Sequence, residues 1–239
     1  RIEAIDTAAG RAVPGVLLIV AGRDLVHAGV KPIPTTREFK RLDGSPAQSP
    51  PYHALAVDTV RFAGEAVAAV VATTRDEARD ALDAIEIRYA ASPAVVEMGE
   101  AIASGAPVVW PAASGNIACE ARHGNQAAAE AAFGRARHVV TLDLVNQRVV
   151  PAPIEPRVVL AGYERDADRL TLQVSCQTPT GYRDELCKYV LGIPREKVRV
   201  LVGDIGGGFG MKTAVYPEDV VVAWLARELK RPLTERSVI

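Results

Sequence analysis

Short apolar runs mark the first predicted strands of this chain. Residues 16–21 are apolar throughout and are followed by Gly22, and the shortness of the run predicts a buried strand rather than a helix. A long polar loop with several prolines follows, at about residues 29–51. Residues 60–62 and 66–72 then predict two more strands joined by a glycine turn.

A helix is predicted directly after these strands. Thr74 and Glu77 have the spacing of a capping box, with threonine at the cap and glutamate three residues later. Apolar residues between positions 78 and 85 recur at helical spacing, and residues 85–89 alternate as in a half-exposed strand. Residues 60–89 therefore predict a compact α/β unit of strand, helix and strand.

The middle of the chain differs in composition from both ends. It is rich in alanine, glycine, serine and proline and has weak periodicity, apart from a helical stretch at 126–133, so residues 91–135 are interpreted as a connector. Extended chain is predicted at 138–145 and 158–163, interrupted by the proline-containing segment 151–157, and a further strand is predicted at 169–175.

The last third of the chain alternates between helix and strand signals. Thr180 is a candidate cap for a helix over residues 181–191, which Gly192 would end. A strand is predicted at 198–202, followed by a glycine-rich loop.

Pro217 opens a last predicted helix, with Glu218 and Asp219 in its first turn, where acidic side chains favour the helix dipole. The order of elements predicts an α/β fold with one domain at residues 1–90 and a second at 136–239, on either side of the connector.

Charge and composition exclude several classes of protein. Lysine and arginine number 28 against 29 aspartates and glutamates, so no basic excess is present to hold a nucleic acid or an anionic membrane. The longest apolar runs, at 66–72 and 220–226, are far shorter than the about 20 residues of a membrane span. The three cysteines form no metal or disulfide spacing. These features predict a soluble, cytoplasmic protein.

The most unusual segment is the loop at residues 203–212, Gly-Asp-Ile-Gly-Gly-Gly-Phe-Gly-Met-Lys. Glycine destabilises regular structure by about 0.5–1 kcal/mol per residue, so this density indicates a backbone that approaches something closely. Phosphate binding by an anion nest is one interpretation. However, a Walker loop needs glycine where Met211 stands, and Pro217 delays the helix of a dinucleotide fingerprint. A flexible surface loop is the alternative, against which Phe209 argues.

Two other positions are candidates for chemistry. Gln177 lies between a predicted strand and a predicted helix, where it either presents an amide donor to a site or is an ordinary polar residue near a cap. Glu155-Pro156-Arg157 is either part of a site or a structural salt link. No histidine metal site or serine triad is predicted, because the four histidines lie far apart: His27, His53, His123 and His138.

Several segments together carry a family resemblance. They are residues 146–157 (Asn-Gln-Arg-Val-Val-Pro-Ala-Pro-Ile-Glu-Pro-Arg), Cys176-Gln177, Leu191-Gly192-Ile193-Pro194 with Val198-Arg199-Val200, and residues 204–212. In order and spacing they resemble the large, molybdenum-binding subunit of the xanthine dehydrogenase, aldehyde oxidase and carbon monoxide dehydrogenase family. Residues 60–89 resemble the α/β hammerhead domain of that subunit.

The resemblance implies a hydroxylase that inserts a water-derived oxygen into a C–H bond of an aldehyde or N-heterocycle, or that oxidises carbon monoxide. The cofactor implied is molybdenum held by a pterin dithiolene, in the cytosine dinucleotide form, so no protein ligand to the metal is expected. The residues implied to contact the cofactor are Gln177, Gly207, Gly208, Phe209 and Gly210.

The resemblance also implies what is expected outside this chain. The first hammerhead strand is expected before Arg1, which is not a methionine, and the catalytic glutamate is expected beyond Ile239, so the chain is interpreted as the amino-terminal part of a large subunit. Partners implied are the rest of the large subunit and subunits carrying 2Fe-2S and FAD, assembled as a dimer of heterotrimers. No catalytic residue is assigned within the chain.

Substrate and role stay open in the sequence. Thr213 follows Lys212 where purine-oxidising members carry an acidic residue, which weighs against xanthine. The alternative to an enzyme fragment is a non-catalytic cofactor-carrier or assembly module derived from the same subunit. A nucleotide-binding domain that uses the glycine loop is a third hypothesis.

Overall fold

The structure, a computed structural model, describes residues 1–35, 38–147 and 149–235. Arg148, within the segment that carries the family resemblance, and Ile239 lie outside the described residues. The chain forms two compact units, one of residues 1–35, 51–96 and 151–239 and the other of residues 36–50 and 97–150. The first unit therefore joins distant parts of the sequence. The domain boundaries at 90 and 136 stay a prediction.

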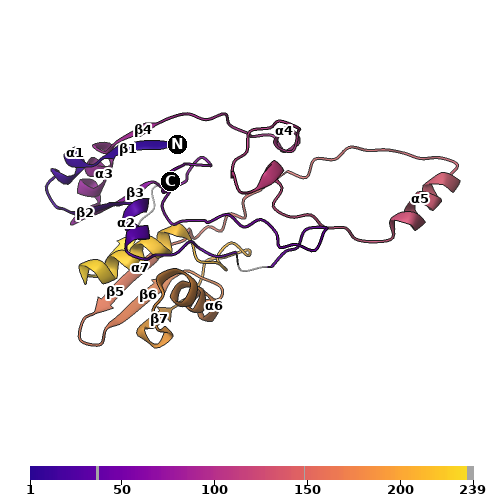
Figure 1. The fold of residues 1–239 in the computed structure, drawn as a ribbon. Helices are drawn as coiled ribbons and strands as arrows, with labels where there is room; N and C mark the ends of the chain where they lie inside the picture. Colours follow the sequence, from indigo (N-terminus) through magenta and orange to yellow (C-terminus); the bar gives the residue numbers. More distant parts are fainter. Residues whose placement is uncertain (36–37, 148, 236–239) are drawn as a thin grey trace. The chain divides into compact units, whose positions relative to one another are not determined.

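The amino-terminal part of the first unit contains two antiparallel strand pairs. The first pairs β1 (Ile2–Asp6) with β4 (Glu86–Tyr89), and the second pairs β2 (Val16–Ala21) with β3 (Ala68–Ala72) (Figure 1). Three helices accompany these strands: α1 (Ala8–Arg11), α2 (Gly22–His27) and α3 (Arg75–Asp83). Both pairs bring residues from before position 22 against residues from after position 67.

The strand at 16–21 and the helix after Thr74 confirm the sequence prediction. The Oγ1 of Thr74 accepts a hydrogen bond from the Glu77 N–H (3.3 Å), and the Glu77 carboxylate accepts one from the Thr74 N–H (2.9 Å). Both halves of the capping box are therefore formed.

The predicted strand at 60–62 is wrong. The Arg61 N–H donates to the Glu65 carboxylate at 2.6 Å, so a side chain takes the place of a neighbouring strand. The predicted unit of 60–89 also lacks β1 and β2. Strand β3 pairs with β2 and strand β4 pairs with β1, so β3 and β4 do not pair with each other. The strand at Ile2–Asp6 and the helix at Gly22–His27 were not predicted.

The carboxyl-terminal part of the first unit is a four-stranded sheet in the order β7-β6-β5-β8. Strand β5 (Val159–Glu164) runs antiparallel to β6 (Arg169–Val174) and to β8 (Leu233–Glu235), and β7 (Val198–Leu201) runs parallel to β6. Helix α7 (Pro217–Leu229) packs on β5 and β6 (Figure 1). The contact is tight, since the residues that form it are completely buried: Val159, Ala161, Leu172, Val220 and Ala223.

Helix α6 (Pro179–Glu185) follows β6 and continues as a π-helical segment over Leu186–Leu191. Gly192 ends it in the left-handed conformation (φ 61°), as predicted. The predicted cap at Thr180 is wrong. The helix begins at Pro179, and the preceding Thr178 turns its hydroxyl away to donate to the Thr213 carbonyl (2.9 Å). The start of α7 at Pro217 is confirmed.

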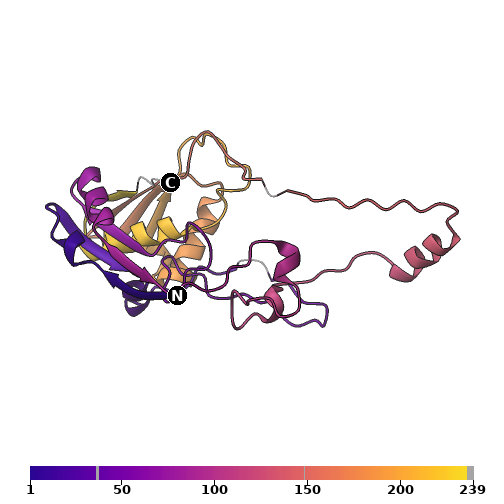
Figure 2. The ribbon, with the colours of Figure 1, turned by 90° about the horizontal axis from the view of Figure 1, so that it is seen from above.

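The second unit has little regular structure. It contains α4 (Met98–Ala101), a 3-10 turn (Ser114–Asn116) and α5 (Gln126–Arg135), whose cap Asn125 accepts from the Ala128 N–H at 3.0 Å. The helix predicted at 126–133 is thereby confirmed, and long irregular stretches flank it (Figure 2). Strand β5 at Val159–Glu164 confirms the extended segment predicted at 158–163, whereas the described residues 138–145 form no strand.

Candidate functional site

The glycine-rich loop meets two other segments of the first unit. It connects β7 to α7, and it contacts the segment before β5 and the turn between β6 and α6. Two backbone hydrogen bonds hold the segments together: the Gln177 N–H donates to the Lys212 carbonyl (2.7 Å), and the Glu155 N–H donates to the Gly206 carbonyl (3.5 Å). The structure thus brings together residues that the resemblance had grouped only in sequence.

The loop fixes the orientation of the Gln177 side chain. Its Oε1 accepts hydrogen bonds from the N–H groups of Gly210 (3.1 Å) and Lys212 (3.2 Å). The side chain is exposed, and within the described part of the chain its Nε2 has no hydrogen-bond partner. Since an amide carries its donor and its acceptor at opposite corners, the bound oxygen directs the NH₂ group outward as a donor.

The glycines leave space for these side chains. A β-carbon on Gly208 would lie 2.4 Å from the Gln177 Oε1, and one on Gly206 would lie 2.7 Å from the Glu155 β-carbon. Gly207 has a φ of +95°, which only glycine adopts at little cost. The glycines are therefore required where the loop receives side chains from its neighbours, and a flexible loop does not explain them.

Glu155 contacts the loop at two positions, Gly206 and Lys212. Its Oε2 accepts from the Gly206 N–H and from the Lys212 ammonium, 3.1 Å away. These two donors, the Gly206 N–H first, lower the pKa of Glu155. The Lys212 side chain is 0% exposed, so Glu155 is its counter-charge in the interior. The sequence does not predict this pairing because the two residues lie far apart in the chain.

Glu155 and Arg157 do not form a salt link with each other. Arg157 pairs instead with Glu218 in the first turn of α7, with 2.6 Å between Nη2 and Oε1. The three-residue cluster thus connects the segment before β5 to two later parts of the chain.

Phe209 has the least ordinary conformation in the loop. It adopts a left-handed φ of +50°, and 74% of the residue is exposed. Left-handed backbone is uncommon for a bulky residue and concentrates at functional sites. The apolar ring therefore stands at the surface rather than in the core.

Comparison with known proteins decides the family. Residues 109–236 match the molybdopterin cofactor-binding domain, and residues 1–93 match the a/b hammerhead domain of aldehyde oxidase and xanthine dehydrogenase. The chain belongs to this family. The resemblance noted in the sequence and the mixed α/β fold class are thereby confirmed.

Relatives that match nearly the whole chain include large subunits of named enzymes. The nicotine 6-hydroxylase large subunit of Paenarthrobacter nicotinovorans is 34% identical, over 98% of this chain and 28% of its own length. The carbon monoxide dehydrogenase large chain of Hydrogenophaga pseudoflava is 31% identical, over 98% of this chain and 29% of its own. The quinoline 2-oxidoreductase of Pseudomonas putida 86 superposes with a TM-score of 0.87 at 32% identity, over 100% of this chain and 29% of its own. The chain spans less than a third of each.

The described residues contain neither a metal-ligand cluster nor a membrane-spanning helix. Among the described residues, no three histidine, cysteine, aspartate or glutamate side chains gather where they could hold a metal ion. Across the same residues, the helices are all too short or too polar to cross a membrane.

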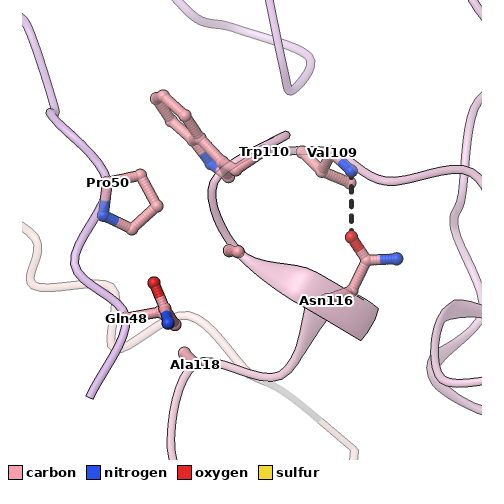
Figure 3. A pocket seen from close by; sticks show the side chains of 7 residues that line it. Gln48, Pro50, Val109, Trp110, Asn116 and Ala118 are labelled. Carbon is pink, nitrogen blue, oxygen red and sulfur yellow. Dashed lines mark hydrogen bonds between the residues drawn. The ribbon is translucent and has the colours of Figure 1, made fainter. Parts of the chain in front are cut away.

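A small hollow lies within the second unit, lined by Gln48, Pro50, Val109, Trp110, Ala113, Asn116 and Ala118 (Figure 3). The Asn116 amide accepts from the Val109 N–H (2.9 Å) and donates to the carbonyls of Ala101 and Pro107 (both 2.9 Å). Because its donors and its acceptor bind backbone, Asn116 holds the surrounding turns in place.

Asp219 lies in the first turn of α7, and its burial predicts a pH dependence of stability. The carboxylate is buried and accepts from the Tyr216 N–H at 2.9 Å, and burial raises its pKa to about 7 from 3.8. Between these values the folded chain holds a proton that the unfolded chain has lost. The free energy of unfolding should therefore fall as the pH rises from about 4 to about 7, by roughly 4 kcal/mol at most. Denaturant titrations at several pH values measure this slope.

Asp219→Asn is the control for this titration. It keeps an acceptor for the Tyr216 N–H but cannot ionise, so it should flatten the slope between pH 4 and 7. An unchanged slope in the variant would assign the pH dependence to other groups.

Proposed function

We propose that this chain is part of the large subunit of a molybdenum hydroxylase and that Gln177, Gly207, Gly208, Phe209 and Gly210 contact the molybdenum-pterin cofactor. The observation that carries the proposal is the orientation of the Gln177 amide. Its oxygen is fixed by two loop N–H groups, and its Nε2 points outward as an unused donor.

The residues present fit such a cofactor. The glycines let the backbone approach a bulky anionic group, and Nε2 donates a hydrogen bond without adding charge. Phe209 supplies an apolar wall that excludes water. When bound, the cofactor supplies the electron acceptor and the oxygen transfer from water to the substrate.

The proposed substrate is an aldehyde, an N-heterocycle or carbon monoxide. Relatives at similar identity are named for nicotine and for carbon monoxide, so identity alone does not separate these classes. Thr213, in place of an acidic residue, weighs against xanthine. Its hydroxyl donates to the Gly210 carbonyl at 2.9 Å and is thus part of the loop's own structure.

The proposed partners are the rest of the large subunit and subunits carrying 2Fe-2S and FAD, as a cytoplasmic dimer of heterotrimers. The cofactor is proposed in its cytosine dinucleotide form. Relatives named as a large chain and as a subunit of a dehydrogenase complex support such an assembly. Exposed apolar side chains of the second unit support a covering surface as well: Val140 is 92% exposed and Leu144 is 80% exposed.

Gln177→Ala in the complete enzyme tests the proposal. Loss of one preorganised donor should lower kcat by about 10²-fold. Turnover with the three substrate classes and molybdenum content by mass spectrometry are measured together. A normal rate at normal loading would remove Gln177 from the site.

Assays on the isolated 239-residue chain distinguish two hypotheses, an enzyme fragment and a non-catalytic cofactor-carrier module. An enzyme fragment should show no turnover, because the general base is expected elsewhere in the subunit. A carrier module should bind the molybdenum-pterin cofactor stoichiometrically as an isolated chain. Turnover by the isolated chain would contradict both hypotheses.

A further inference from the structure

Arg157 reaches the carboxyl end of the glycine loop through an aromatic ring. Its guanidinium carbon lies 3.7 Å from the centroid of the Tyr216 ring. Its Nε and Nη2 donate to the Glu218 Oε1 at 2.8 and 2.6 Å. The planar guanidinium is thus held on one side by a ring and at its edge by a carboxylate, which is an arrangement that lysine cannot reproduce.

Tyr216 connects Arg157 to the loop by hydrogen bonds. Its hydroxyl donates to the carbonyl of Met211, and its N–H donates to the Asp219 carboxylate at 2.9 Å. Met211 stands between Gly210 and Lys212, whose N–H groups hold the Gln177 oxygen. A continuous series of contacts therefore leads from Arg157 through Tyr216 and Met211 to the Gln177 amide.

Glu155 holds the same loop directly, at Gly206 and at Lys212. It accepts from the Gly206 N–H and from Lys212, while Arg157 acts through Tyr216 beyond Lys212. Two residues separated only by Pro156 thus brace the whole span from 206 to 216. The loop needs such support because glycine leaves its backbone with many accessible conformations.

We propose that Arg157 and Tyr216 are positioning residues that hold the glycine loop, and through it the Gln177 amide, in the orientation that the molybdenum-pterin cofactor requires. Neither residue contacts the reacting atoms. The proposal rests on the function proposed above, because it assigns these residues a purpose at that site.

Tyr216→Phe in the complete enzyme is the central test. It removes the hydroxyl bond to Met211 and leaves the ring beside Arg157. The matched control is Tyr163→Phe, which removes a hydroxyl bond to Asp168 at the β5–β6 turn, at the far end of β5. Hydrogen exchange of the peptide spanning 206–212, followed by mass spectrometry, reports on the loop. The Mo(V) electron paramagnetic resonance spectrum and the steady-state rates report on the site.

We expect Tyr216→Phe to speed exchange of the Gly210 and Lys212 amides by about fivefold, the scale of one lost hydrogen bond. The Mo(V) spectrum should change, and kcat should fall with KM unchanged, whereas Tyr163→Phe should match the wild type. Arg157→Leu should act in the same direction, and Arg157→Lys should restore only part of the effect because it lacks the planar stack.

Two outcomes would overturn the proposal. One is unchanged exchange at 206–212 in Tyr216→Phe. The other is faster exchange with an unchanged Mo(V) spectrum and kcat, which would make the contacts merely structural. The molybdenum content of the wild type separates these results from failure of the proposed function: wild-type enzyme without molybdenum would refute the function, whereas loaded wild-type enzyme with an unaffected variant would refute only the positioning role.

Discussion

Gly208→Val in the complete enzyme should abolish molybdenum loading or turnover while the hammerhead domain stays folded. Any β-carbon at this position would lie 2.4 Å from the Gln177 Oε1 and 2.5 Å from its Cδ, far inside contact distance. Valine adds two further methyl groups. The Gln177 side chain would have to leave the loop and lose its bonds to the Gly210 and Lys212 N–H groups. Metal content by mass spectrometry, turnover and circular dichroism measure the three parts of this prediction.

Gly203→Ala is the matched control in the same loop. A β-carbon there meets no atom within 4 Å, and its φ lies outside the left-handed region, so loading and rate should stay normal. A double variant isolates the cause. If the clash with Gln177 is responsible, Gly208→Ala should add little in a Gln177→Ala background. Normal loading and turnover in Gly208→Val would show that the loop is only a structural turn.

Local signals in the sequence predicted the elements that depend on them. The capping box at Thr74, the left-handed Gly192 and the helix start at Pro217 each need only neighbouring residues, and each is formed. The strand at Ile2–Asp6 depends instead on β4, more than eighty positions later, and five residues before a short helix carry no such local signal. The strand at 60–62 failed for a related reason, since a side chain took the backbone donor of Arg61.

At the candidate site, too, local signals were predicted from the sequence and long-range contacts were not. Glycine density marked the loop, the place between a predicted strand and a predicted helix marked Gln177, and the family resemblance linked the two; the structure then shows their contact. Neither signal predicted that Glu155 pairs with Lys212 or that Arg157 lies on Tyr216, because each contact joins residues more than fifty positions apart. Pairing at such separation is set by the sheet that brings β5 beside β6, and not by spacing in the sequence.

Glu155→Gln should destabilise the chain by roughly 2–3 kcal/mol. Glutamine keeps an oxygen for the Gly206 N–H but removes the negative charge beside Lys212. The Lys212 side chain is 0% exposed, so its ammonium would be left in the interior without a counter-charge. The expected cost lies below that of a fully enclosed pair because 32% of the Glu155 side chain is exposed. The free energy of unfolding from denaturant titration measures it.

Lys212→Met separates the lost ion pair from lost packing. Methionine fills most of the buried space without a charge. The remaining Glu155 carboxylate stays partly exposed to solvent and keeps its hydrogen bond from the Gly206 N–H. This variant should therefore lower the free energy of unfolding less than Glu155→Gln does. The double variant Glu155→Gln with Lys212→Met should recover much of the lost stability, because no unpaired charge remains inside. If the two single costs simply add in the double variant, Glu155 and Lys212 are not energetically coupled, and the contact between them does not anchor the loop.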